Sequence, residues 1–398
     1  MSVTFPRGFR ASAGAAGMKP SGRLDVGLLV ADRPVAAAGL FTTNAFAAAP
    51  VRLSRARLAR GTAQALIVNS GQANAATGER GDLDAVTITD SVAGALGLDA
   101  DLVLACSTGV VGEPLHMEQL LGVVPRLVES LAPDGGPSFA EAIMTTDTKP
   151  KQARAERGSF RVGGCAKGVG MIAPDLALAT LLVFMTTDAP IPPDEIGKLA
   201  SEILEPKFES LSVDGCTSTN DTVLLLASGA AGVDPVVPGT AAWDQVSEAV
   251  AEVGDSLLLQ LAEDAEGADH VVLVDVTGAE TDEDARLAAK AVVESLLVKA
   301  AIFGGDPNPG RILQAVGSSG ARVIEDAVDV RMGGVPVVVG GAVPEGFWGA
   351  GGAEDARAAT AKRDVTISIS LGAGPGRSRA LGTDLSYEYV RINAEYTT

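Results

Sequence analysis

Residues 167–189 read KGVGMIAPDLALATLLVFMTTDA, a loop with two glycines and a proline that leads into Ala179-Thr180. The apolar residues 181–185 that follow predict a β-strand. A threonine at the head of such a strand is structural in most proteins. Here the glycines and the proline permit unusual backbone angles just upstream of Thr180, where a strained peptide bond that undergoes an N-to-O acyl shift would lie. Cutting the bond before Thr180 would give its hydroxyl an α-amine as general base and make the chain an enzyme.

The pattern outward from this loop predicts an α/β (α+β) fold, because short apolar runs alternate with amphipathic stretches. Strands are predicted at 26–30, 65–69, 102–106, 222–227, 271–276 and 365–371, and helices at 82–96, 117–132, 139–144, 193–210, 243–263 and 282–301. The strand after Thr180 is continuous with the fold on both sides. A cut there would leave two interleaved chains, 1–179 and 180–398, rather than two free domains.

Composition narrows the class of protein. The chain has 398 residues and a net charge of −19, which argues against a nucleic-acid partner because phosphate binding needs clustered lysine and arginine. No apolar run has the length and lack of charge of a membrane helix, and no signal-peptide core is recognisable near the start. We therefore expect a soluble, cytoplasmic protein without a membrane partner.

Cysteine and histidine are too sparse for several kinds of site. The three cysteines, Cys106, Cys165 and Cys216, stand far apart without metal-binding spacing, so we expect reduced core residues. The two histidines, His116 and His270, leave little room for a Ser-His-Asp or a histidine-metal scheme. We therefore expect no metal or other cofactor, and a base that is not histidine.

Two further segments carry candidate chemistry. Residues 107–112, STGVVG, follow an apolar strand, and there Thr108 and Gly109 offer a hydroxyl and a main-chain N–H to a developing oxyanion. An ordinary turn is the alternative. Glu266, in DAEG at 264–267, follows a long predicted helix and is a candidate for binding a substrate ammonium. A solvated helix end is the alternative there.

Taken together, ordered blocks of the chain resemble the ornithine acetyltransferases, also called glutamate N-acetyltransferases of the ArgJ family, from residue 3 to residue 398. The blocks are VTFPRGF at 3–9, VNSGQANAATG at 68–78, STGVVGEPL at 107–115, IMTTDTKPK at 143–151, KGVGMIAP at 167–174, ATLLVFMTTDA at 179–189, DGCTSTNDTVLL at 214–225, DAEGA at 264–268, LVKAAIFGGDPN at 297–308 and YVRINAEYTT at 389–398. Each block alone is weak, but their order along the whole chain is specific.

The resemblance implies a self-processing acyltransferase with a layered fold of mixed sheets sandwiched by helices. The precursor is expected to cut itself between Ala179 and Thr180, which makes Thr180 the nucleophile of a heterotetramer of two α and two β chains. Thr108 and Gly109 match the oxyanion-hole pair of the family. The substrate-contacting positions of the family match Thr145, Lys167, Thr180, Glu266, Asn393 and Thr398.

The reaction that the resemblance implies is a ping-pong acetyl transfer in arginine biosynthesis. Acetyl passes from N2-acetylornithine to Thr180 and then to glutamate, and no cofactor takes part. Lys167 would bind the α-carboxylate of the donor and Glu266 the ornithine ammonium. Acetyl-CoA is a further donor that the resemblance allows.

Two alternatives remain open from the sequence. The same N-terminal threonine would act as an amidase or aminopeptidase-type hydrolase if water replaced the second amine. An uncleaved, inactive homologue that serves as a binding protein is the other, because Leu178-Ala179 make the loop two residues longer than the family pattern.

Overall fold

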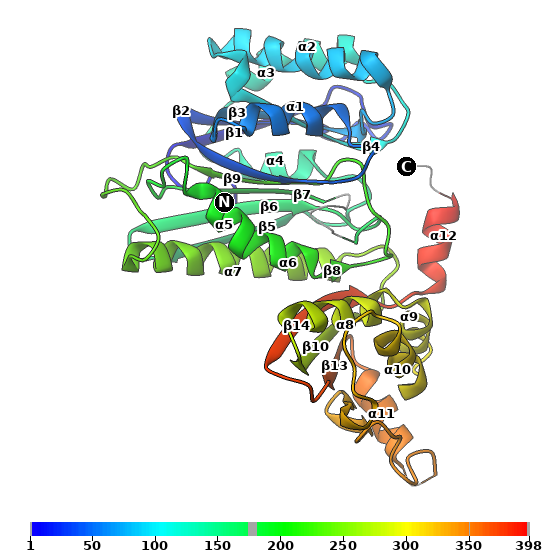
Figure 1. Cartoon of the computed structure of the whole chain (residues 1–398). Helices are drawn as coiled ribbons and strands as arrows, with labels where there is room; N and C mark the ends of the chain where they lie inside the picture. The colour runs from blue at the N-terminus through cyan, green and yellow to red at the C-terminus, as the bar shows by residue number, and fades with distance from the viewer. Residues whose placement is uncertain (1, 174–180, 350, 396–398) are drawn as a thin grey trace. The chain divides into compact units, whose positions relative to one another are not determined.

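The structure, a computed structural model, describes residues 2–173, 181–349 and 351–395. The chain forms two compact units (Figure 1). The first comprises Met1–Glu209 and Cys216–Leu261, and the second comprises Ser210–Gly215 and Ala262–Thr397. The predicted cut after residue 179 therefore falls inside the first unit and not between the two units.

A mixed sheet runs through the first unit. Its strands are β1 (Phe9–Gly14), β2 (Val26–Phe41), β3 (Thr62–Gln72), β4 (Val103–Val110), β5 (Lys151–Arg157), β6 (Phe160–Lys167), β7 (Leu182–Thr187) and β9 (Thr222–Ala227). Hydrogen bonds link them in the order β4-β3-β2-β9-β7-β6-β5, with β1 paired to β2. The pairs β3–β4 and β7–β9 are parallel, and the other neighbours in this sheet are antiparallel.

The long strand β2 folds this sheet into two layers. Its first half pairs with β3 at Val26–Val30, and its second half pairs with β9 along Ala36–Phe41, while Val35 and Ala36 still pair with β3. The register shifts between the halves, where residues 32–34 are exposed and Pro34 has no N–H to donate. Figure 1 shows the consequence: β1 to β4 lie in one layer, and β9, β7, β6 and β5 lie in the other.

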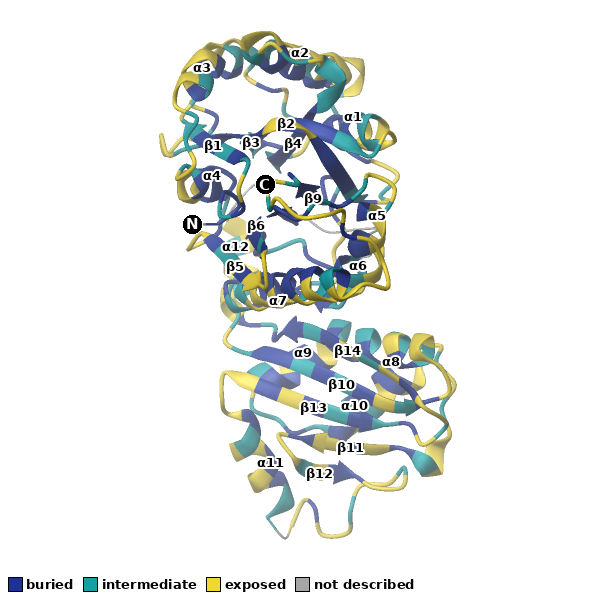
Figure 2. Ribbon diagram, turned by 90° about the vertical axis from the view of Figure 1, so that its left-hand side faces the viewer, coloured by how far each residue is buried: buried dark blue, intermediate teal, exposed yellow. Residues whose placement is uncertain are grey.

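Helices cover both outer faces of these layers. The first unit contains α1 (Ala49–Leu58), α2 (Gly78–Leu96), α3 (Met117–Glu129), α4 (Gly136–Ala142), α5 (Ile196–Leu199), α6 (Glu205–Glu209) and α7 (Ala241–Glu263). Helices α2 and α3 pack on the β1–β4 layer, and α7 lies along the other layer (Figures 1 and 2). Helix α4 contributes to the core between the layers. Its Phe139 ring packs edge to face against the Phe184 ring of β7, with 5.7 Å between the ring centroids.

The second unit has a smaller mixed sheet. Its strands are β8 (Leu211–Ser212), β10 (Val271–Ala279), β11 (Asp329–Met332), β12 (Val335–Val338), β13 (Asp364–Ser370) and β14 (Gly376–Thr383), in the order β12-β11-β13-β10-β14-β8. Its helices are α8 (Asp282–Glu294), α9 (Leu296–Phe303), α10 (Pro309–Gly317), α11 (Gly352–Thr360) and α12 (Tyr387–Glu395). One apolar core joins this sheet to α8, α9, α10 and α11.

The predicted fold class is confirmed, with corrections at particular elements. The single helix predicted over 282–301 is two helices, because Ser295 leaves the helical conformation at ψ 111° and its side chain caps α9 by accepting the Val298 N–H. Apolar spacing continues across the break because both helices face one core, as Val292 and Ile302 do. Predicted strand 181–185 is β7, and the helix predicted over 193–210 is α5 and α6 joined by a π-helical turn at Ala200–Leu204.

The cysteines differ from one another in environment. Cys106 and Cys165 are buried, and burial raises the pKa of the Cys106 thiol to about 12, so it stays protonated. The prediction of a core position is wrong for Cys216, which is exposed just before β9. Within the described ranges, no three His, Cys, Asp or Glu side chains are grouped so as to hold a metal ion. No helix in the same ranges combines the length and apolarity needed to span a membrane.

Candidate active site

A contact between the two layers brings Thr108 and Lys167 together. Four strands separate β4 from β6 in the sheet order, so a flat sheet would hold them about 24 Å apart. Yet the Lys167 ammonium donates to the Thr108 hydroxyl oxygen over 3.2 Å. Folding at β2 closes this distance. Strand alternation aims both side chains between the layers, because Thr108 shares a face with Cys106, and Lys167 shares one with Cys165, and both cysteines are in the interlayer core.

Gly109 is required by the backbone at the end of β4. Its φ of +133° is one that residues with a side chain rarely adopt, and an added Cβ would lie 2.2 Å from the carbonyl carbon of Gly71. Parallel pairing of β3 with β4 sets Gly71 opposite Gly109 and Ser70 opposite Thr108. The pair Thr108-Gly109 is thus held against the neighbouring strand, with Thr108 only 1% exposed.

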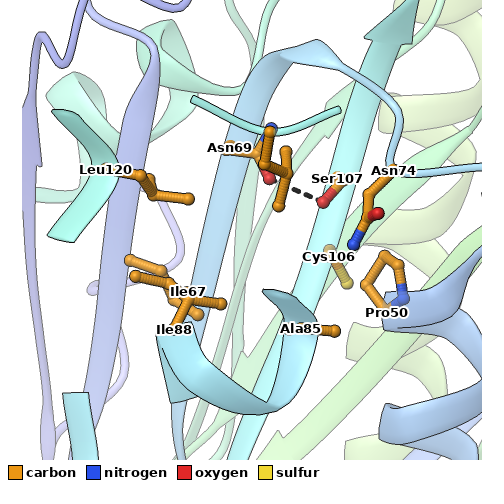
Figure 3. A pocket seen from close by; sticks show the side chains of 11 residues that line it. Pro50, Ile67, Asn69, Asn74, Ala85, Ile88, Cys106, Ser107 and Leu120 are labelled. Carbon is orange, nitrogen blue, oxygen red and sulfur yellow. Dashed lines mark hydrogen bonds between the residues drawn. The ribbon is translucent and has the colours of Figure 1, made fainter. Parts of the chain in front are cut away.

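The preceding residue, Ser107, faces the opposite side of β4. Figure 3 shows its hydroxyl in a cavity on the helix side of the sheet, where it donates to Asn69 Oδ1 over 2.6 Å. The cavity has a volume of about 10 Å³ and apolar walls that include Ile67, Ile88 and Leu120. This cavity is too small for an amino-acid substrate, and the predicted oxyanion-hole residue Thr108 faces the other side of β4.

Asp147 organises the loop beside Lys167. Its wholly buried carboxylate accepts the Lys151 ammonium at 2.6 Å, the Gly168 N–H at 2.9 Å and the Thr145 N–H at 3.0 Å. Burial acts to raise the pKa of this carboxyl, but the positive charges of Lys167 and Lys151 outweigh it and hold the pKa at about 2. Half-buried Thr145 is therefore tied, through one carboxylate, to the residue that follows Lys167.

Ala179 and Thr180 lie outside the described residues, but the chain is described from Leu181 onward. Leu181 is wholly buried, and its N–H donates to Asp221 Oδ1 over 2.6 Å. Strand β7 then starts at Leu182, directly opposite Lys167 in the antiparallel pairing with β6. The chain that leaves position 180 thus enters the sheet beside Lys167.

Asn220 fixes the backbone just before Thr108. Its amide donates to the carbonyl of Ser107 at 2.8 Å and to that of Ala73 at 2.6 Å. Neighbouring Asp221 holds Leu181, so two consecutive residues fix β4 at Ser107 and the chain at the start of β7. Sequence reasoning missed Asn220, Asp221 and Asp147. All three lie inside quoted blocks, DGCTSTNDTVLL and IMTTDTKPK, as polar residues next to an apolar strand or a lysine pair.

The second unit carries Glu266 and Asn393, which contact each other. Asn393 on α12 donates to Glu266 Oε2 over 3.1 Å. Gly267 packs so closely against α12 that an added Cβ would lie 2.2 Å from the Tyr389 nitrogen. Thr398, the remaining predicted substrate contact, lies outside the described residues.

The loop that bears Glu266 is also fixed from the other side. Asp384 accepts the Asp269 N–H at 3.0 Å and meets His270 Nδ1 at 2.6 Å. Glu266 is half-buried, and the turn that follows it is hydrogen-bonded to Asp384.

The ArgJ family profile matches residues 10–398. The chain belongs to the ArgJ family. An arginine biosynthesis bifunctional protein ArgJ from Thermosynechococcus vestitus is 43% identical over 411 residues, covering 100% of this chain and 98% of the relative. A protein of the same name from Thermus thermophilus is 44% identical, with 100% of both chains covered. A crystal structure of the Bacillus halodurans protein of that name has 38% identity and a TM-score of 0.50, covering 54% of this chain and 98% of that one.

Family membership confirms the resemblance and the enzyme class expected from it. The chain is an ArgJ-family acyltransferase, and its relatives are named for arginine biosynthesis. Of the residues expected at the site, the first unit brings together Thr108, Gly109 and Lys167, with Thr145 tied to them through Asp147. Their individual roles in an ArgJ-family reaction stay predictions.

Proposed function

We propose that the chain transfers acetyl from N2-acetylornithine to glutamate through an acetyl ester on Thr180. The observation that carries this proposal is the buried contact of Lys167 with Thr108, beside the start of the strand that follows position 180. The Lys167 ammonium, the Thr108 hydroxyl and the strand that begins at Leu182 thus lie close together, and Gly109 follows Thr108 directly. These are the groups that an acyl transfer through an N-terminal threonine needs.

Self-cleavage between Ala179 and Thr180 produces the nucleophile. The products, 1–179 and 180–398, remain associated because β6 and β7 lie on opposite sides of the cut and pair along Val162 to Lys167. We propose that these products assemble as a heterotetramer of two α and two β chains.

In the first half-reaction Thr180 Oγ attacks the acetyl carbonyl of N2-acetylornithine and the α-amine of Thr180 accepts its proton. Lys167 uses the Thr108 oxygen as acceptor, which leaves the Thr108 O–H to donate elsewhere. That hydroxyl and the Gly109 N–H stabilise the oxyanion. The amide C–N bond then breaks, the α-ammonium of Thr180 returns its proton to the departing nitrogen, ornithine leaves as the amine, and acetyl-Thr180 remains.

In the second half-reaction the amine of glutamate attacks the ester and takes the acetyl group. Lys167, within reach of the nucleophile strand, binds the α-carboxylate that both amino acids share. Thr145 and Thr398 add contacts to the substrate. Glu266 and Asn393 receive the ornithine ammonium, and their mutual hydrogen bond aims the carboxylate. Because the relatives are named bifunctional, acetyl-CoA is proposed as a further donor to glutamate.

Comparison of the wild type with Thr180→Ala tests the proposal. The wild type should give two fragments in intact-mass spectra that meet at 179/180, and it should make N-acetylglutamate from N2-acetylornithine and glutamate. Thr180→Ala should remain one folded chain without activity. Acetate release that is indifferent to glutamate would instead assign a hydrolase. A persistent single wild-type species without transfer would assign an inactive homologue.

A further inference from the structure

Asp221 has a buried carboxyl group of which only one oxygen accepts a hydrogen bond from a described residue. It directly precedes β9 and has no exposed surface. Its Oδ1 accepts the Leu181 N–H at 2.6 Å, whereas Oδ2 has no hydrogen-bond partner among the described residues. A buried carboxyl oxygen without a partner is costly, because it has lost its hydration without a replacement. The unpaired Oδ2 of Asp221 beside Leu181 therefore needs a physical explanation.

Covalent geometry says which group can reach that oxygen. The nitrogen of residue 180 is joined to the Leu181 nitrogen through only three covalent bonds. The Leu181 N–H is already bound to Asp221. In the uncut chain, residue 180 offers at most a peptide N–H. After a cut before Thr180, the same nitrogen becomes an amine that can carry a full charge.

The electrostatic surroundings of Asp221 favour a nearby cation. Burial raises the pKa of this carboxyl well above its ordinary value, and the counteracting groups are the Leu181 and Ser218 N–H groups and the charge of Lys167. Within the described part of the chain, Lys167 at the end of β6 is the one charged side chain that lowers the pKa of Asp221. The thiol of Cys106 on β4, which hydrogen-bonds Thr222, stays protonated.

We propose that Asp221 is the positioning residue of the N-terminal nucleophile: Oδ1 fixes the first peptide N–H of the new chain, and Oδ2 pairs with the α-ammonium that cleavage releases. This proposal rests on Thr180 being the nucleophile, as proposed above. On cleavage the carboxyl proton moves to the amine, so an O–H bond breaks, an N–H bond forms, and a neutral pair becomes carboxylate and ammonium. Cleavage itself thereby creates the partner that the buried carboxyl lacks.

The pairing has a consequence for the pH dependence of catalysis. An adjacent carboxylate stabilises the ammonium and raises the pKa of the amine, which must be neutral to act as a base. Replacing Asp221 by asparagine keeps an oxygen for the Leu181 N–H and removes the charge. The acidic limb of the kcat/KM profile should therefore move to lower pH by about one unit.

Asp188 provides a matched control at the other end of β7. It is also a buried aspartate whose pKa is raised by burial, and its Oδ1 accepts the Arg161 N–H at 2.8 Å. The six residues of β7 put it roughly 20 Å from Leu181. Asp188→Asn should lower the melting temperature without moving the acidic limb.

The experiment measures cleavage by intact mass and kcat/KM from pH 5.5 to 9 for the wild type, Asp221→Asn and Asp188→Asn. A downward shift in Asp221→Asn alone supports the proposal. A limb that coincides with that of the wild type, or an equal shift in both variants, overturns it. If Asp221→Asn does not fold, Asp221→Thr is judged by the same criteria. An uncut wild type, or an active Thr180→Ala, would instead refute the proposed function, so the two failures are distinguishable.

Discussion

Substitution of Thr108 by valine separates transition-state stabilisation from packing. Valine keeps the shape of threonine but loses both the acceptor of the Lys167 ammonium and the O–H proposed to face the oxyanion. Loss of one oxyanion donor costs a factor of about 10² to 10³ in kcat, or roughly 3–4 kcal/mol in the barrier. Loss of a hydrogen bond from a buried ammonium costs about 1.5–3 kcal/mol of stability. The variant should therefore be folded, less stable and nearly inactive.

The adjacent residue supplies the control for this variant. Ser107→Ala removes a buried hydroxyl from the same strand and leaves Asn69 Oδ1 without its 2.6 Å partner, at a cost of about 1–3 kcal/mol. Its side chain faces the cavity of Figure 3, on the other side of β4 from Lys167. Stability should therefore fall by a similar amount in both variants, while kcat falls only in Thr108→Val.

The assay follows N-acetylglutamate formation per mole of cut chain, with the cut fraction taken from intact mass and the stability from thermal melting. Normalising to cut chain matters because Thr108 can also assist self-cleavage. If Thr108→Val retained kcat within about threefold of the wild type, the oxyanion role would be refuted. Equal losses of kcat in the two variants would show that the effect comes from the strand and not from the Thr108 hydroxyl.

Two further predictions concern charged residues. The pKa of Asp147, about 2, lies below its ordinary value of 3.8, so its charge stabilises the fold above about pH 4 and this contribution, about 2 kcal/mol, is lost as pH falls from 4 toward 2. Asp147→Asn should have a lower melting temperature than the wild type at pH 7, but its melting temperature should fall less between pH 4 and pH 2.5. If the melting temperatures of the two proteins fell in parallel through pH 7, 4 and 2.5, the assignment would be contradicted. Glu266→Gln should raise KM for N2-acetylornithine about tenfold, whereas Glu283→Gln, on the exposed α8 surface, should leave it unchanged; equal KM values would remove Glu266 from ammonium binding.

Much of the fold follows from local patterns. Apolar runs identified β3, β4 and β9 to within a few residues, because these strands are largely buried, and the alternation of apolar and polar residues identified β13, which buries one face. The helix predicted over 282–301 shows the limit of periodicity. Ser295 interrupts it without disturbing the spacing of apolar residues, since both resulting helices face the same core. Periodicity reports which face is buried, and it says little about where the backbone turns.

The candidate site was only partly predictable. Thr108 and Gly109 could be named from the residues alone, because an apolar strand that ends in a glycine-containing loop is visible in the sequence, whereas Lys167 was named only through the resemblance to the family. Asp147 and Asp221 could not be assigned, since their importance lies in backbone N–H groups that they accept from segments 21 and 40 residues away. A carboxylate that anchors a distant amide leaves no local pattern.

The sequence by itself determined the family, the elements and the residue types that acyl transfer requires, because these depend on local order along the chain. Only the tertiary structure decided that Lys167 touches Thr108, two residues separated by four strands in one sheet. The physical reason is the fold in β2, where an exposed, proline-containing segment shifts the register and turns one sheet into two facing layers. That single bend converts distant strand ends into neighbours.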